Sequence, residues 1–431
     1  MADDGPLNQD VPLFLIALAA ALSAPAHAAT LQRVVVDPTE YPNARCNDGT
    51  APVFYVWLAE DEPTNDWIVY LEGGAACNDD ASCTERFMDN PERMGTGCMG
   101  PGDCDASYGV FSDSGPDHMP TTRNKTGLFA DQYSYFSDWN KVHIEYCSSD
   151  NWTGMGGQSG ALTGFQSEFS HGNAEFNGHH IVEAVIDMLS NRAEDHRLGA
   201  PGSRVLFGGG SAGSVGAQQN LDFVADTLVD AEVRGLFDAG FNGTAAYDSA
   251  TPTACSSQLE VGTVPTSTPQ GRIDSYDYRQ SFLDESCVAD AQADGLHPAI
   301  CSSPAYRYQT DHITTPYFMV QAQLDYLTVG NLNANDAITN TLEQIHGPGY
   351  TQTMADRRQC AIEQLRSFGR AAASNTTAFE GWYVPCERWH VMAPNSKAVQ
   401  RVVNGESARS ALRNWYADDG SDYTLVESCT P

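Results

Sequence analysis

Lysine is almost absent from this chain of 431 residues. Only Lys125, Lys141 and Lys397 are present, against 56 Asp and Glu, and the formal net charge is −33. A surface this acidic repels nucleic acid, anionic lipid and polyanionic polysaccharide, so we expect no nucleic-acid partner. Salt would screen the self-repulsion, because the Debye length falls to about 3 Å at about 1 M salt. We therefore hypothesise a salty habitat, which unfolding on desalting would support and indifference to salt would refute.

Metal-binding and nucleotide-binding patterns are also missing. The chain has no CxxC pair, no HExxH, and no GK[ST] of a phosphate-binding loop. His179 and His180 are adjacent, so on a helix they would point about 100° apart and are better suited to surface or core roles than to a shared metal. We expect no metal site.

No stretch of the chain predicts a membrane span. The apolar run Val11–Leu22 is too short to cross a bilayer but has the length of a signal-peptide core. It is followed by Ala26-His27-Ala28, an A-x-A cleavage pattern, although Asp rather than Lys or Arg precedes it. We predict a signal peptide over 1–28 and a secreted or periplasmic protein; the alternative is an N-terminal apolar helix packed on the core.

The cysteines agree with export. Their number is 12, an even count, and two pairs are closely spaced, Cys77 with Cys83 and Cys98 with Cys104. Such spacing favours disulfides in an oxidising compartment.

Short apolar runs alternate with helical patterns along the chain. This alternation predicts βαβ units, and hence an α/β fold with a mostly parallel central sheet and helices on both faces. We expect one catalytic domain over 29–431, a monomer, in which the long connections 77–140 and 240–315 are disulfide-pinned insertions that shape the substrate mouth. The predicted strands are Val53–Leu58, Trp67–Leu71, Val142–Tyr146, Val205–Phe207, Leu236–Phe237 and Tyr317–Val320; the predicted helices are Ile181–Leu189, Ala212–Leu228, Met354–Phe368 and Ala408–Trp415.

The strongest local pattern is RVLFGGGSAGSVGAQQN, from Arg204 to Asn220. Val205–Phe207 predicts a buried strand, GGSAG matches G-x-S-x-G, and a helix follows. In an α/β-hydrolase fold, Ser211 would sit on a strained strand-to-helix turn that lifts its Oγ above the sheet. A Gly-rich phosphate loop or a chance match are the alternatives, and the absence of GK[ST] disfavours the first.

A second glycine-rich turn follows the strand in WIVYLEGGAAC, residues 67–77. An α/β hydrolase takes one oxyanion N–H from the residue after the nucleophile, here Ala212, and another from a loop after an early strand. Gly74 and Ala75 provide that loop here, unless the segment is an ordinary glycine turn.

Four motifs together resemble the pectin acetylesterase/Notum family of α/β hydrolases. They are LEGGAAC, the WNKVHIEYCSSDNWTG stretch from Trp139 to Gly154, GGGSAG, and a late Trp389-His390. The resemblance implies that Ser211 is the nucleophile and that Gly74, Ala75 and Ala212 form the oxyanion hole. It also implies disulfides between Cys46 and Cys147 and between Cys77 and Cys83. The family usually has Trp after these glycines; Gly74-Ala75-Ala76 here implies a reshaped acyl pocket.

The remaining catalytic residues follow from the chain order Ser, acid, His of this fold. His390, in CERWHVMAP, is the last histidine and matches the family's late base, although position alone would also allow a surface or core histidine. Asp325 follows the apolar run YFMVQAQL, as the family's acid does. Its rival is Asp238 in GLFDAGF, which could instead be a turn-former.

These residues predict a two-step acyl transfer. His390 takes the proton of Ser211, Ser211 attacks an ester carbonyl, Asp325 stabilises the imidazolium, and water releases the acid without any cofactor. We expect a small or polymeric ester substrate, with neutral short-chain or aromatic esters first and acetylated pectin or another polysaccharide as the alternative. An acyltransferase on the same triad, or a silent binding protein that a fluorophosphonate would not label, are the other hypotheses.

Overall fold

The structure is a computed structural model. It describes residues 31–59, 64–104, 127, 135–165, 172–192, 196–241, 268–304, 306–307, 312–325, 380–395, 397–417 and 423–427.

A twisted sheet of nine strands runs through the molecule in the order β1-β2-β6-β3-β9-β10-β11-β12-β15. The pairings of β1 with β2 and of β2 with β6 are antiparallel, and every pairing from β6 to β15 is parallel. The strands are Gln32–Val35 (β1), Val53–Trp57 (β2), Trp67–Leu71 (β3), Asn140–Ile144 (β6), Arg204–Gly210 (β9), Glu232–Asp238 (β10), Tyr317–Val320 (β11), Glu380–Val384 (β12) and Tyr423–Val426 (β15).

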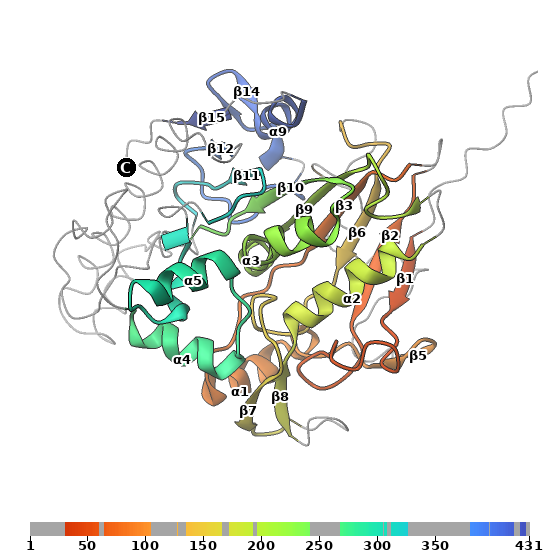
Figure 1. Ribbon diagram of the computed structural model, residues 1–431, viewed down its shortest axis with the longest axis vertical. Coiled ribbons are helices and arrows are strands. Elements are labelled where there is room, and N and C mark those ends of the chain that lie inside the picture. The colour runs from red at the N-terminus through yellow and green to blue at the C-terminus, as the bar shows by residue number, and fades with distance from the viewer. Residues whose placement is uncertain are drawn as a thin grey trace, which may run out of the picture.

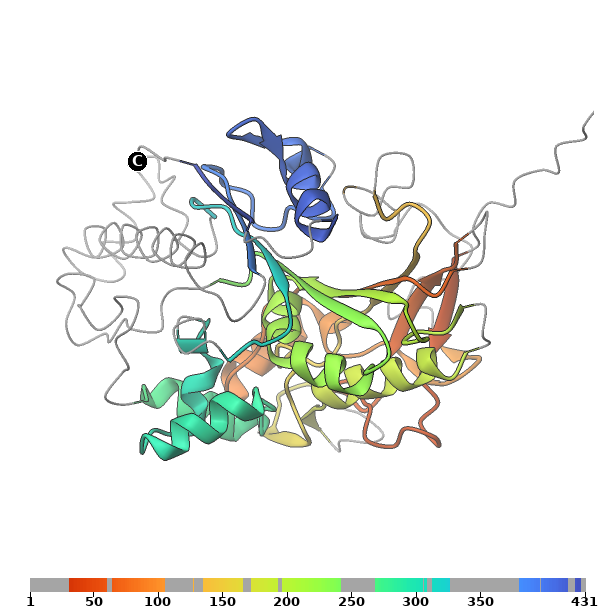
Figure 2. The same ribbon diagram turned by 45° about the horizontal axis from the view of Figure 1, so that its top comes forward.

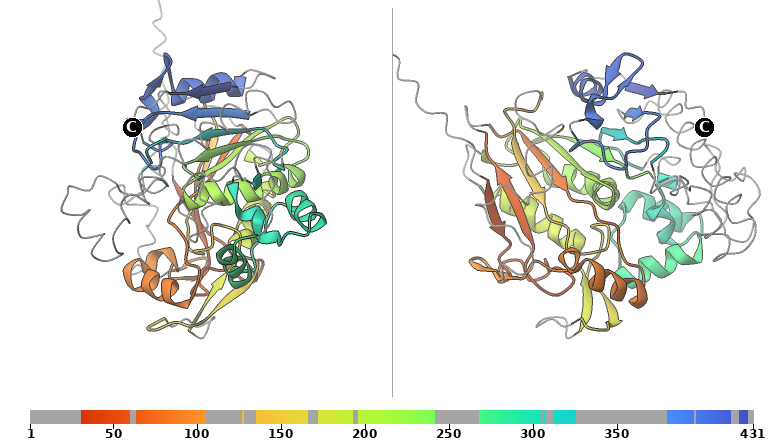
Figure 3. Two further views of the ribbon diagram at one scale, coloured as in Figure 1. Left: turned by 90° about the vertical axis from the view of Figure 1, so that its left-hand side faces the viewer. Right: turned by 180° about the vertical axis from the view of Figure 1, so that it is seen from behind.

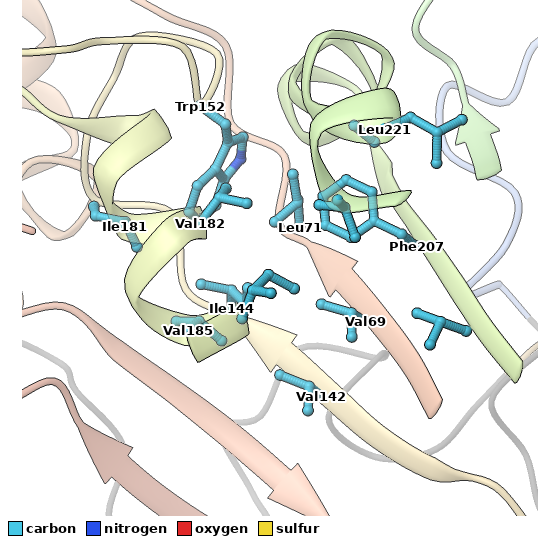
Figure 4. Packing of buried hydrophobic residues seen from close by; sticks show 14 of the residues in the cluster. Val69, Leu71, Val142, Ile144, Trp152, Ile181, Val182, Val185, Phe207 and Leu221 are labelled. Carbon is cyan, nitrogen blue, oxygen red and sulfur yellow. The ribbon is translucent and has the colours of Figure 1, made fainter. Parts of the chain in front are cut away.

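Strands β3 and β11 consist of apolar and aromatic residues throughout, because both faces of the sheet are covered. Successive side chains of a strand point to opposite faces. In β9, Val205 and Phe207 therefore join one hydrophobic cluster and Leu206 joins another. Figure 4 shows the first cluster, in which Val69, Leu71 and Phe207 of the strands lie beneath side chains of the covering helices.

Helices α2 (Gly178–Ser190) and α3 (Ala212–Thr227) cover one face of the sheet, and α9 (Ala408–Ala417) lies on the other (Figures 1 and 2). In α2 the residues Ile181, Val185 and Leu189 are fully buried, four positions apart, as expected for one apolar helix face. In α9, Leu412 and Trp415 pack on the opposite cluster. The fold is thus an α/β hydrolase fold, as the sequence predicts.

Smaller elements gather at one end of the sheet (Figure 3). They are α1 (Asp80–Asp89), α4 (Gln270–Arg279), α5 (Glu285–Ala293), the 3₁₀ helix η9 (Pro298–Ser302) and the hairpin of β7 (Gly157–Ala161) and β8 (Asn173–Phe176). Tyr278 of α4 donates a hydrogen bond to Asp80 of α1 (2.8 Å), and Gln219 of α3 bonds the carbonyl of Cys301 (3.0 Å). We call residues 268–304 the cap.

The remaining short elements flank this framework. They are η1 (Pro91–Arg93), the hairpin of β4 (Cys98–Gly100) and β5 (Asp103–Cys104), η10 (Ala398–Gln400), and the hairpin of β13 (Val402–Val403) and β14 (Glu406–Ser407).

Disulfides join cysteines of the described segments, over both short and long separations in the sequence. Cys46 is bonded to Cys147, Cys77 to Cys83, and Cys287 to Cys301. The first two are the pairs that the family resemblance implies. The third joins α5 to η9 inside the cap and has a sequence separation of 14 residues.

The predicted elements agree with the structure to within a few residues, with some omissions. The predicted strand Val142–Tyr146 starts earlier, at Asn140, because Asn140–Ile144 is the segment that pairs with β3. The patterns of β1, β12, β15 and the cap helices were missed. The predicted helix Met354–Phe368 lies outside the described residues.

None of the helices in the described part of the chain has the length and apolar character needed to cross a membrane. Within the same residues, no three His, Cys, Asp or Glu are grouped so that they could hold a metal ion.

Candidate active site

Ser211 lies at the junction of β9 and α3, in a backbone conformation that residues with side chains rarely adopt. Its φ is 56° and its ψ is −120°. Its N–H donates to the carbonyl of Asp238 on the neighbouring strand at 2.8 Å, which holds the turn. A Cβ on Gly209 would lie 2.4 Å from Gly213, and a Cβ on Gly213 would lie 2.1 Å from the carbonyl oxygen of Leu71. The turn therefore needs both glycines, as the G-x-S-x-G pattern predicts.

The loop after β3 passes directly against this turn. A Cβ on Gly73 would lie 2.5 Å from the carbonyl oxygen of Gly210 and 2.9 Å from the Cβ of Ser211. Gly74 and Ala75 both have positive φ, 155° and 58°. Ala75 and Ala212 line the same cavity as Ser211, whereas Gly74 is not among the described residues that line it.

Two charged side chains hold this loop in place. Arg93 forms an ion pair with Glu72 (3.0 Å) and donates to the carbonyl of Gly73 (2.9 Å). The Glu72 carboxylate also accepts a bond from the backbone N–H of Tyr146 at 3.0 Å. The loop is therefore tied to the end of β6 as well as to the turn that carries Ser211.

The structure gives a role to the SSDNW segment that the sequence only marked as distinctive. Asp150 is fully buried, and its carboxylate accepts bonds from the hydroxyl of Ser148 (2.6 Å) and from the N–H groups of Trp152 (2.9 Å) and Gly178 (2.7 Å). Burial raises the pKa of this carboxyl, and these bonds oppose the rise. Asp150 thereby closes a tight loop that places Asn151 in the cavity wall.

His390 and Asp325 meet although 65 residues separate them. His390 Nδ1 lies 2.8 and 3.0 Å from the two carboxylate oxygens of Asp325. Asp325 is fully buried and also accepts a bond from Gln321 Nε2 at 3.0 Å, while the His390 side chain is 14% exposed. His390 lines the cavity that Ser211 lines. The structure thus brings the three predicted triad residues to one place.

Asp238, the rival acid, is bonded differently. It is fully buried at the end of β10, and its carboxylate accepts bonds from the backbone N–H groups of Met392 and Ala393. Burial raises its pKa to about 7; the backbone bonds and His390 lower it, and Asp325 raises it further. The carboxylate next to the His390 ring nitrogen is that of Asp325, and Asp238 binds the backbone that follows His390.

The cavity in front of Ser211 has a volume of about 470 Å³. The β3 loop, the start of α3, the loop carrying His390 and the cap contribute its walls. The cap residues that line it are Gly271, Arg272, Ser275, Tyr276, Arg279, Ser281, Leu283 and Ser302. The sequence predicts that residues 240–315 shape the mouth of the substrate cavity. It does not indicate which cap residues line the cavity, because the cap carries no motif that indicates a function.

A strained serine between a parallel strand and a helix, with a buried Asp–His pair beside the same cavity, is the arrangement typical of α/β hydrolases. The Pectinacetylesterase family model matches residues 24–431, so the chain belongs to the pectinacetylesterase family.

Curated relatives and solved structures agree with this family. Pectin acetylesterase 5 of Arabidopsis thaliana is 28% identical over 389 residues, which cover 86% of this chain and 77% of that protein. Palmitoleoyl-protein carboxylesterase notum2 of Xenopus laevis is 32% identical over 204 residues, 46% of this chain and 34% of that protein. The chain thus spans about a third of that relative's length, and 58% of the length of Arabidopsis pectin acetylesterase 4.

A solved structure of the Wnt deacylase Notum from Drosophila has the same fold. It superposes with a TM-score of 0.65 at 24% identity and covers 93% of this chain and 97% of that one.

Proposed function

We propose that this protein is a serine carboxylic-ester hydrolase in which Ser211 is the nucleophile, His390 the general base and Asp325 the acid of the triad. The observation that carries the proposal is the contact between His390 and the buried Asp325 at the cavity that Ser211 lines. Membership of a family whose named relatives include pectin acetylesterases and carboxylesterases supports the reaction class.

The reaction starts with proton transfer. Asp325 binds Nδ1 of His390, so Nε2 is the nitrogen that takes the proton of the Ser211 hydroxyl. Asp325 stabilises the imidazolium that results, and the Ser211 oxygen attacks the ester carbonyl. His390 then gives its proton to the departing alcohol, which leaves an acyl group on Ser211.

The oxyanion is stabilised by backbone N–H groups. Ala212 begins α3, so its N–H belongs to the positive end of the helix dipole. The N–H groups of Ala75 and Gly74 are the second source that the fold provides. Water activated by His390 then releases the acid and restores Ser211.

A cavity of about 470 Å³ falls within the size range of small-molecule sites, about 300–1,000 Å³. We propose acetyl or other short-chain esters as substrates, and an acetylated polysaccharide as the second candidate because relatives are named pectin acetylesterases. The A-x-A pattern after an apolar run and the disulfides support removal of residues 1–28 and export. We also propose that residues 29–431 form a single domain and that the protein is monomeric.

The direct test measures hydrolysis of p-nitrophenyl esters from C2 to C16 by wild type and Ser211→Ala. We expect the highest kcat/KM at short chains, and a loss of about 10⁴-fold or more in kcat for Ser211→Ala. The matched control is Ser190→Ala, since among the described residues the Ser190 hydroxyl bonds only the carbonyl of Ile186 on α2 (2.8 Å). Retained activity in Ser211→Ala would place the nucleophile elsewhere.

A further inference from the structure

The cavity in front of Ser211 has a charge opposite to that of the protein. The chain carries 56 acidic residues and 23 Lys and Arg. Yet the described residues that line the cavity include Arg272, Arg279 and His390 and no Asp or Glu. Most charged residues of this chain are acidic, so the composition alone would predict an acidic lining. The cationic lining is therefore specific to this site.

The Arg279 side chain is buried and hydrogen-bonded within the fold. It is 6% exposed, its Nε donates to the carbonyl of Cys77 at 3.0 Å, and its Nη2 contacts the side-chain oxygen of Asn78. Burial lowers its pKa, and the nearby Tyr146 and Asp150 oppose that effect. These contacts tie α4 to the segment after β3, so Arg279 stabilises the wall of the cavity.

The Arg272 side chain makes fewer hydrogen bonds within the described residues than Arg279 does. Its Nη1 donates to the hydroxyl of Ser302 at 2.9 Å, and no carboxylate of the described residues lies within ion-pair distance. A guanidinium has five N–H donors. Burial and the nearby Arg307 lower its pKa to about 10, so Arg272 remains charged at neutral pH although its surroundings penalise that charge. None of the described residues provides an anion that compensates this cation.

The neighbouring backbone adds to the positive potential. Arg272 is in the first turn of α4, a helix of ten residues that follows Pro269 and begins at Gln270. The N-terminal N–H groups of a helix carry partial positive charge. Gly271 lines the cavity, and a Cβ at this position would meet no atom of the described residues within 4 Å. The described residues therefore leave space for a ligand group at Gly271, the neighbour of Arg272 in the chain.

We propose that Arg272 binds a carboxylate carried by the ester substrate, so that the enzyme acts on esters of anionic molecules. The inference rests on the proposed function of Ser211, and it changes the expectation of a neutral ester that the acidic surface suggested. Long-range repulsion from that surface is screened by salt, whereas a bidentate contact between guanidinium and carboxylate acts at hydrogen-bond distance.

The test uses matched ester pairs that differ in one negative charge. For a charge on the alcohol side, 4-acetoxybenzoate is compared with its methyl ester; for a charge on the acyl side, monomethyl glutarate is compared with dimethyl glutarate. In wild type we expect the anionic member of at least one pair to have the higher kcat/KM.

Arg272→Gln should lower kcat/KM for that anionic ester about ten- to a hundred-fold, the size expected for a charge-assisted hydrogen bond, and should change the neutral ester less than about two-fold. Arg272→Lys, which keeps the charge, should recover part of the loss. Arg413→Gln is the control because Arg413 is exposed on α9 and bonds only Asn414 within the part of the chain that the structure describes. Unchanged unfolding temperatures would show that the variants remain folded.

A binding measurement separates this inference from the proposed function. In the Ser211→Ala background, calorimetry should show that the preferred anionic ester binds and that adding Arg272→Gln weakens this binding about ten-fold or more. If wild type hydrolyses the neutral esters but Arg272→Gln affects both members of both pairs equally, the inference is wrong and the esterase proposal stands. If wild type hydrolyses none of the four esters, the proposed function fails and the inference falls with it.

Discussion

The carboxylate of Asp238 accepts hydrogen bonds from the backbone N–H of Met392 at 3.0 and 2.9 Å, although 154 residues separate the two. Met392 follows His390 by two positions, and the carbonyl of Asp238 accepts the N–H of Ser211 at 2.8 Å. One residue at the end of β10 therefore holds both the turn that carries Ser211 and the segment that carries His390.

Asp238 should make stability depend on pH. Burial raises its pKa to about 7 in the folded protein, from an ordinary value near 3.8. Between these values the folded state holds a proton that the unfolded state has released. The contribution to stability is therefore complete below about pH 4 and is lost as the pH rises through 7. The slope should approach about 1.4 kcal/mol per pH unit for one proton.

Urea unfolding of wild type and Asp238→Asn between pH 4.5 and 7.5, at constant salt, measures this. In the variant, the contribution of Asp238 to the slope of unfolding free energy against pH should disappear. Asp48, whose pKa burial raises to about 6, should contribute to the slope equally in both proteins. The variant should also have a lower kcat, because both carboxylate oxygens of Asp238 accept the N–H of Met392, and an amide puts an NH₂ donor in the place of one of them. If the free energies of unfolding of the two proteins changed with pH in parallel, the pKa of Asp238 would be unshifted by folding and the prediction would be wrong.

Gly73→Ala should damage catalysis more than stability. The new Cβ would lie 2.5 Å from the carbonyl oxygen of Gly210 and 2.9 Å from the Cβ of Ser211, so the nucleophile turn or the oxyanion loop must move. A displacement of about 1 Å at a reacting group can cost about 10²-fold in rate. We expect kcat on a short-chain p-nitrophenyl ester to fall by about that factor, with an unfolding cost of about 1–3 kcal/mol.

Gly100→Ala is the matched control, since among the described residues its Cβ would meet only Pro38, at 3.6 Å or more, and its φ is not positive. It should keep nearly full activity. A Gly73→Ala variant with wild-type kcat would mean that the oxyanion loop does not depend on its close approach to Ser211.

Salt should stabilise the protein. With 56 acidic residues, three lysines and a net charge of −33, repulsion among surface carboxylates opposes folding, and added salt screens it. Thermal unfolding in NaCl from about 0.05 to 2 M should show a rising midpoint, most steeply below about 0.5 M. KCl should act alike if screening is the cause; a midpoint independent of either salt would remove the hypothesis of a salty habitat.

The residues alone do not determine which of the two aspartates pairs with His390. Asp238 and Asp325 each follow a buried strand, and these strands, β10 and β11, are parallel neighbours in the sheet. Both carboxylates therefore arrive at the same edge, near the same histidine. The family resemblance favoured Asp325, but the residues alone did not distinguish a partner of the His390 ring from an anchor of the backbone after it.

The cap shows a second limit. Arg272 and Ser302 approach each other across 30 residues because Cys287 is bonded to Cys301 and the cap packs on α3. No local pattern marks either residue, so their position at the cavity could not be predicted from the sequence.

Local sequence by itself determined the nucleophile turn, the glycines on each side of it and the alternation of strands and helices, because these depend on backbone sterics and on apolar periodicity over a few residues. Tertiary structure alone decided which carboxylate meets His390, which loop presses on Ser211 and which cation faces the cavity. Those contacts join segments tens to hundreds of residues apart, and their geometry comes from the packing of the whole sheet and its cap.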